Sequence, residues 1–346
     1  MKDMKGQEMK RLSLKDVAKM AGVAPSTVSF VLNGKARQMR ISDELAEKVM
    51  AVVNKTGYQP HSVAVNLRTG QSKTLGLIVE SISGSFFAAL ARVIETEADR
   101  FGYNIVYCST ENNAQKGSDL IRMLSRQQVD GYLITPAAGM EKDIQQLLAH
   151  KRPVVLMDSY FPELAVPYVL IDNMGGVKQG MEHLLDKGYK KIGFVTVDME
   201  LVQVQDRLEG YKETLRNNRI AVKNKQILKI AYNSPREESI RSMQQFIREN
   251  KGMDAIFFST NYLGILGLES IAGLGMKIPD DIAMICFDDH DIFRLYPPGI
   301  TVVQQPIEEI AKTAMGLLMS QLDKGQRATK KTQVQVPGKF VKRGSV

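Results

Sequence analysis

The 346-residue sequence contains only two cysteines and four histidines, and neither set has the spacing of a metal or redox site. Cys108 and Cys286 are far apart, which suits a reducing compartment and predicts two buried thiols. The histidines are scattered without an HExxH pair, and the glycines from Gly264 to Gly275 have neither the GxGxxG nor the Walker spacing. No nucleophile elbow occurs. We therefore expect no enzyme activity, no cofactor and no metal.

The chain also lacks an apolar run at its start. Residues Met1 to Arg11 are polar and charged, so we expect neither a secretion signal nor a membrane anchor there, and we expect a cytoplasmic protein. The length alone suggests about two domains, and a hydrophobic content of 44% is enough for a sizeable core.

Positive charge is concentrated near the N-terminus. Residues 1–72 contain twelve Lys and Arg against six Asp and Glu, so they carry +6 of the net +8 of the whole chain. Three quarters of the excess therefore lies in about a fifth of the chain, as expected for a segment that neutralises phosphates.

The same segment predicts two short helices joined by a glycine turn, followed by a third helix. Ser13 and Asp16 have the spacing of a capping box, and Gly22 suits the left-handed residue that ends a helix. Pro25 suits the first position of the second helix, and Ser42 suits the cap of the third. The second helix would be exposed and would fit the DNA major groove. A small helical bundle with a polar face is the alternative, which the charge disfavours.

These residues resemble the lactose and galactose repressor (LacI/GalR) family of bacterial transcription factors. The resemblance is carried by Leu14-Lys-Asp-Val-Ala-Lys-Met-Ala-Gly-Val, Ser26-Thr-Val-Ser, Leu32-Asn33-Gly34 and Gly57-Tyr58-Gln59-Pro60, and it continues for nearly the full length. It implies a homodimer whose second helices enter successive major grooves of a near-palindromic operator.

Two positions depart from the family pattern. Phe30 stands where most members have Arg, so it cannot contact guanine in a bidentate manner but can touch a thymine methyl. A core aromatic is the alternative for Phe30. Ala24 stands where a Ser usually caps the recognition helix, a loss of about 1 kcal/mol of helix stability.

Residues 60–73 contain a segment with Val63, Ala64 and Leu67 on one helical face. It is too short to be a stable isolated helix. The resemblance implies a hinge helix that orders on DNA, with Leu67 wedged into the minor groove; an ordinary linker is the alternative. The predicted DNA contacts are Ser13, Leu14, Pro25, Ser26, Thr27, Ser29, Phe30, Asn33, Ser42, His61, Ala64 and Leu67.

From Thr74 onward, short apolar runs alternate with helical stretches, a pattern typical of parallel sheets covered on both faces. The fold class is α/β, with an all-α helix-turn-helix domain before two doubly wound lobes, and the resemblance implies the two-lobed fold of periplasmic sugar-binding proteins. We expect a flexible tail (1–12), a helix-turn-helix domain (13–59), a hinge and linker (60–73) and a core (74–346). The expected lobes are 74–160 with 291–322, and 161–290 with 323–346.

Ligands of such sheets bind beyond the carboxyl ends of the strands. Arg207 and Asp288 match the family positions that most often hold the effector, and a guanidinium with a carboxylate can grip paired hydroxyls or an acidic group. An interlobe salt bridge is the alternative. The predicted effector contacts are Phe86, Phe87, Asp158, Gln203, Gln205, Arg207, Tyr232, Thr260, Asn261 and Asp288.

The sequence thus predicts a nucleoid-associated transcription regulator, in the first instance a repressor, whose operator affinity is set by a sugar or sugar phosphate bound between the lobes. Ser81-Ile-Ser-Gly-Ser-Phe-Phe departs from the usual Asp-Ile-x-Asn-Pro-Phe-Phe, so another small metabolite or a protein co-regulator stays open. No apolar heptad extension is seen before the chain ends at Val346, which predicts a dimer rather than a tetramer. A sugar-binding protein of periplasmic type without a DNA-reading role is the alternative.

Overall fold

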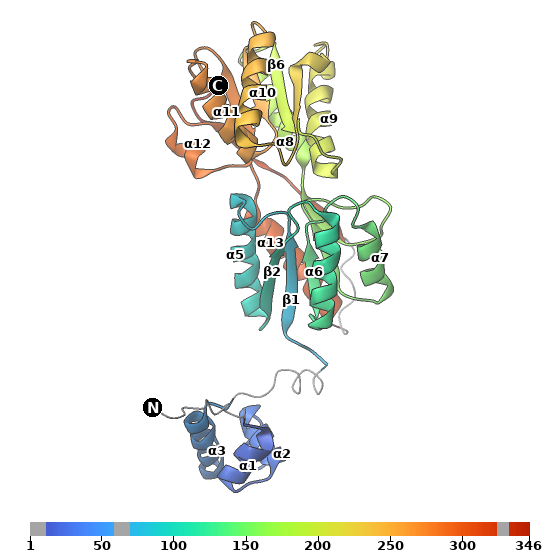
Figure 1. The fold of residues 1–346 in the computed structure, drawn as a ribbon, viewed down its shortest axis with the longest axis vertical. Coiled ribbons are helices and arrows are strands. Elements are labelled where there is room, and N and C mark those ends of the chain that lie inside the picture. The colour runs from blue at the N-terminus through green and yellow to red at the C-terminus, as the bar shows by residue number, and fades with distance from the viewer. Residues whose placement is uncertain (1–11, 59–69, 324–331) are drawn as a thin grey trace, which may run out of the picture. The chain divides into compact units, whose positions relative to one another are not determined.

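The structure is a computed structural model that describes residues 12–58, 70–323 and 332–346 (Figure 1). The chain divides into two compact units, residues 1–72 and residues 73–346. The predicted tail up to Arg11, and the predicted hinge contacts His61, Ala64 and Leu67, lie outside the described residues.

The described part of the first unit contains three helices with the expected boundaries, α1 (Leu14–Ala21), α2 (Pro25–Leu32) and α3 (Asp43–Thr56). The capping box of α1 is formed, because the Ser13 amide donates to Asp16 Oδ2 at 2.9 Å and the Asp16 amide donates to Ser13 Oγ at 3.3 Å. Gly22 ends α1 with φ at 68°. The helices enclose a small apolar core made of Val17, Ala18, Ala21, Val28, Val31, Val49, Val53 and Tyr58.

The second unit is built on two sheets, each of which forms the centre of a lobe. The sheet of the first lobe is entirely parallel, in the order β11-β5-β4-β3-β1-β2. Its strands are β1 (Thr74–Val79), β2 (Asn104–Ser109), β3 (Gly131–Ile134), β4 (Val154–Met157), β5 (Tyr168–Ile171) and β11 (Gln333–Val336). Helices α5 (Ser85–Arg100) and α13 (Ile307–Leu322) cover one face, and α6 (Ala114–Arg126) and α7 (Glu141–Ala149) cover the other.

The sheet of the second lobe has the order β12-β10-β9-β8-β6-β7, in which only β12 runs antiparallel to its neighbour. Its strands are β6 (Ile192–Val197), β7 (Ile227–Ile230), β8 (Ala255–Phe258), β9 (Ala283–Phe287), β10 (Thr301–Gln304) and β12 (Lys339–Val341). Helices α10 (Arg236–Glu249), α11 (Asn261–Gly273) and α12 (Asp291–Leu295) cover one face, and α8 (Asn173–Asp186) and α9 (Val202–Asn217) cover the other. A short 3-10 helix, η1 (Asn224–Gln226), precedes β7.

The lobe boundaries that we expected are wrong at three strands. We placed β5 and β11 in the second lobe and β10 in the first, whereas β5 and β11 complete the first sheet and β10 pairs with β9 in the second. The chain therefore passes between the lobes after β5, after β10 and after β11, as Figure 1 shows. An apolar run such as Tyr168–Ile171 predicts a buried strand, but tertiary packing determines which of the two sheets that strand joins.

The described helices include none that is long and apolar enough to cross a membrane.

Candidate functional site

The second helix of the first unit, α2, carries five of the nine predicted DNA contacts that the structure describes. Its inner face carries Val28 and Val31, which are buried in the three-helix core. Pro25 and Ser26 are exposed, and Thr27, Ser29 and Phe30 are half-buried. Phe30 does not belong to the apolar core of this unit, so the alternative that it is a core aromatic is not supported.

Four other predicted DNA contacts have structural roles in the first unit. Ser13 caps α1 and Ser42 caps α3, where the Leu45 amide donates to Ser42 Oγ at 3.3 Å. Leu14 is half-buried and packs against the core. Asn33, at the end of α2, donates to the Ser29 carbonyl and, at 3.4 Å, to Ser29 Oγ. Ala24 supplies no side-chain cap, as its identity predicts.

The second unit contains a cavity of about 530 Å³ at the carboxyl ends of the strands of both sheets. Residues that follow β1, β4, β7, β8 and β9 line it, which is where ligands of open parallel sheets bind. Nine of the ten predicted effector residues line this cleft: Phe86, Phe87, Asp158, Gln203, Arg207, Tyr232, Thr260, Asn261 and Asp288. Gln205 does not; its side chain is exposed and donates to the Met199 carbonyl at 3.3 Å, because it lies on the opposite side of the first turn of α9 from Gln203.

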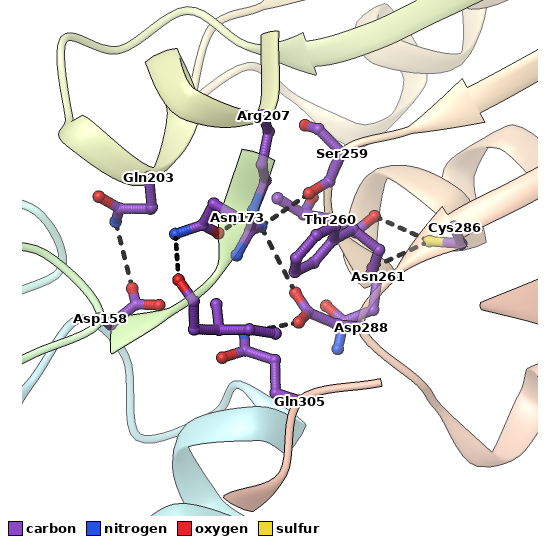
Figure 2. A network of polar contacts seen from close by, with 12 residues as sticks. Asp158, Asn173, Gln203, Arg207, Ser259, Thr260, Asn261, Cys286, Asp288 and Gln305 are labelled. Carbon is purple, nitrogen blue, oxygen red and sulfur yellow. Dashed lines mark hydrogen bonds and ion pairs between the residues drawn. The ribbon is translucent and has the colours of Figure 1, made fainter. Parts of the chain in front are cut away.

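Arg207 is the centre of the polar network in this cleft (Figure 2). Its Nε donates to Asn173 Oδ1 at 2.8 Å, and its Nη1 donates to the Ser259 carbonyl at 2.7 Å and lies 3.7 Å from Asp288 Oδ2. The guanidinium also stacks on Phe287, 3.8 Å from the ring centroid. Both members of the Arg207–Asp288 pair are buried and belong to the second lobe, so the alternative of an interlobe salt bridge is wrong for this pair.

Two other contacts do join the lobes. The Gln203 amide on α9 donates to Asp158 Oδ2, after β4, at 3.1 Å. The Asn261 amide at the start of α11 donates to Ser85 Oγ at the start of α5, also at 3.1 Å. Both contacts are made by residues that line the cavity, so the walls of the cavity include hydrogen bonds between the lobes.

Several cleft residues were missed from the sequence. Glu80 directly follows β1, and the rule that favours residues after a strand would have found it if the end of the strand had been placed at Val79. Gln305 follows β10 and donates to Asp288 Oδ1 at 2.7 Å, but that strand had been assigned to the other lobe. Glu111, Tyr262 and His290 also line the cavity.

Carboxylates in this cleft are held in surroundings that disfavour their charge. Burial, followed by the charge of Asp158, raises the pKa of Glu80 to about 7. Burial raises the pKa of Asp158 to about 6, with Arg207 opposing the shift and Asp288 adding to it. The pKa of Asp288 is also raised by burial and lowered in part by Arg207. Burial in the cleft therefore favours the neutral form of Glu80 and Asp158.

A helix-turn-helix unit and a two-lobed α/β unit with a polar cleft define a ligand-responsive DNA-binding protein. Residues 13–61 match the family described as bacterial regulatory proteins, lacI family, and residues 181–346 match the periplasmic binding protein-like domain. The chain is 31% identical to the transcriptional repressor PurR of Photobacterium profundum over 90% of its length and 92% of that protein. It is 30% identical to the ribose operon repressor of Halalkalibacterium halodurans over 96% of both chains. The chain belongs to the lacI family and is a DNA-binding transcriptional repressor, not an enzyme.

Solved structures have the same fold. A lac repressor dimer bound to operator and an anti-inducer superposes with a TM-score of 0.83 at 22% identity, covering 97% of this chain and 99% of that one. The regulator CelR in complex with cellobiose gives a TM-score of 0.72 at 24% identity, covering 97% and 100%. Because the chain belongs to the lacI family, the alternative of a binding protein without a DNA-reading role is not supported.

Proposed function

We propose that the cavity of the second unit is the effector site, and that a sugar-like molecule bound there sets the affinity of the first unit for its operator. The observation that carries this proposal is the position of nine predicted effector residues around one cavity at the carboxyl ends of two parallel sheets. Related proteins include a ribose operon repressor and a regulator solved in complex with cellobiose, which supports a sugar-like ligand.

The contacts between the lobes supply the mechanism. Gln203–Asp158 and Asn261–Ser85 join opposite walls of the cavity. A ligand changes the equilibrium between lobe angles only to the extent that it binds one angle more tightly. By linkage, the same difference in free energy alters operator affinity.

We further propose a homodimer that reads a near-palindromic operator. The support is the exposed N-terminal end of α2, with Pro25 and Ser26 accessible and Thr27, Ser29 and Phe30 beside them. Two such helices, about one helical turn of DNA apart, match two half-sites. A protein with this role acts at the chromosome, so we propose that it is located in the cytoplasm with the nucleoid.

DNA binding is tested with the purified full chain on the regulatory region of its own gene, across a salt series. Phe30→Ala should weaken binding to the specific site, because it removes an apolar contact to a base, while leaving the salt slope nearly unchanged. Met50→Ala changes an exposed side chain on α3 and is the matched control. Equal loss for both variants would remove Phe30 from the DNA interface.

The effector site is tested with a pair of variants on one helix. Gln203→Met removes the contact with Asp158, and Gln205→Met makes the same chemical change outside the cleft. We expect only Gln203→Met to change the concentration of effector at which operator affinity shifts. If both variants respond as the wild type does, the effector binds elsewhere.

A further inference from the structure

The charges of the cleft differ from those that a sugar phosphate needs. Four carboxylates line the cavity, those of Glu80, Glu111, Asp158 and Asp288. Among the described residues that line it, Arg207 is the one Lys or Arg. A phosphate group is bound in proteins by several N–H donors or by cations that are free to pair with it.

Arg207 is already engaged by the protein itself. Its Nε donates to Asn173, its Nη1 donates to the Ser259 carbonyl and lies beside Asp288, and Phe287 covers one face of the guanidinium. Arg207 and Asp288 therefore neutralise each other within the second lobe. The lining of the cavity thus offers one guanidinium to four carboxylates, and Arg207 only partly offsets the raised pKa of Glu80 and of Asp158.

A second observation concerns Gln203, which is 5% exposed and lines the cavity. Its amide nitrogen donates to Asp158, so its carbonyl oxygen, Oε1, is the group left to interact with a ligand. That Oε1 atom is buried and has no hydrogen-bond partner among the described residues. A buried acceptor without a donor is unfavourable, so this position favours a ligand that brings N–H or O–H groups.

We infer that the effector is a cationic sugar-sized molecule, an amino sugar, whose ammonium group lies between Glu80 and Asp158 and whose hydroxyls face the second lobe. This inference rests on the proposed function of the cleft. An ammonium supplies three donors and no acceptor, so it can pair with both carboxylates. Tyr232 lies beside Glu80 and adds an aromatic side chain, which favours a cation over a neutral group.

Two further facts support an organic cation. The raised pKa values of Glu80, about 7, and Asp158, about 6, have burial as their main cause, and an ammonium would offset the cost of their ionisation. The part of the chain that the structure describes contains no cluster of three His, Cys, Asp or Glu side chains placed to hold a metal ion. The sugar phosphate that the sequence suggested is accordingly disfavoured.

The test is calorimetric binding of matched ligands to the full chain. Glucosamine, galactosamine and mannosamine are each compared with the parent sugar, the N-acetyl derivative and the 6-phosphate. We expect one amino sugar to bind at least about tenfold more tightly than its neutral and phosphorylated counterparts, the equivalent of one charge-assisted contact. A neutral sugar or a sugar phosphate that binds as tightly overturns the inference, as does the absence of amino-sugar binding at millimolar concentration.

Variants then locate the ammonium. Glu80→Gln and Asp158→Asn should each remove most of the preference for the amino sugar while leaving the weak affinity for the parent sugar. Glu95→Gln removes a carboxylate from an exposed position on α5 and should change nothing. Unchanged preference in both cleft variants places the amine elsewhere and overturns the inference.

Operator binding separates this inference from the proposed function. An amino sugar that binds without altering operator affinity supports the cation site but contradicts the regulatory role of the cleft. A neutral sugar that binds and does alter operator affinity supports the regulatory role of the cleft but contradicts the cation site.

Discussion

Replacing Glu80 by Gln should remove the part of the pH dependence of core stability that is caused by ionisation of this buried carboxyl. The groups that face Glu80 are Asp158, Tyr232, Asn112 and Arg207, and of these only Arg207 is a cation. The pKa of Glu80 is raised from 4.5 to about 7. At roughly 1.4 kcal/mol per pKa unit, ionised Glu80 destabilises the folded protein by at most about 3.5 kcal/mol.

The sign follows from proton binding. Between the unfolded pKa near 4.5 and the folded pKa near 7, the folded chain holds a proton that the unfolded chain releases. The free energy of unfolding of the wild type should therefore fall as pH rises through this window, and the full cost should be present above it. Glu80→Gln stays neutral at this position, so the remaining dependence should come from other buried carboxyls such as Asp158 and Asp288.

The assay is calorimetric unfolding of the full chain without ligand at several pH values from acidic to mildly alkaline. Wild type and Glu80→Gln should be nearly equal at the acidic end, and the variant should be more stable at the alkaline end. Glu95→Gln, on the exposed side of α5, should follow the wild type throughout. If the difference in stability between Glu80→Gln and the wild type does not grow with pH, burial does not raise the pKa of Glu80 and the reasoning is wrong.

Three other substitutions test parts of the structure. Ser13→Ala removes the capping box of α1 and should destabilise the first unit by about 1 kcal/mol, seen as a lower melting temperature of residues 1–72 with the core unaffected. Ala24→Ser should stabilise α2 by a similar amount, about 1 kcal/mol, and no gain in thermal stability would show that the α2 N-terminus is already satisfied. Arg207→Met leaves Asp288 and Asn173 buried without the guanidinium and should lower the free energy of unfolding of the core by about 3–5 kcal/mol. A loss of effector response with unchanged stability would instead show that Arg207 acts only as a ligand contact.

The described helices of the first unit are the part of the fold that could be predicted best. The helix boundaries of α1, α2 and α3 follow from Ser13, Gly22, Pro25 and Gly57, because caps, turns and left-handed glycines act within a few residues of chain. What the sequence could not decide here is which exposed groups of α2 meet DNA, since this depends on a partner molecule.

In the second unit, the apolar runs determined that strands exist, and their carboxyl ends indicated where a ligand would bind. Only the tertiary structure decided that β5 and β11 belong to the first sheet and β10 to the second. A buried apolar strand could pair with either sheet, and the rest of the fold determines which strand is available as its neighbour.

The site shows the same division. Arg207 and Asp288 could be selected from the sequence as a cation and an anion at strand or helix ends. Their pairing inside one lobe, and the exposure of Glu80 and Asp158 to a cleft with no free cation in its described lining, could not be predicted. Local patterns specify which groups are present, whereas the charge of a site is the sum over residues from distant segments that only folding brings together.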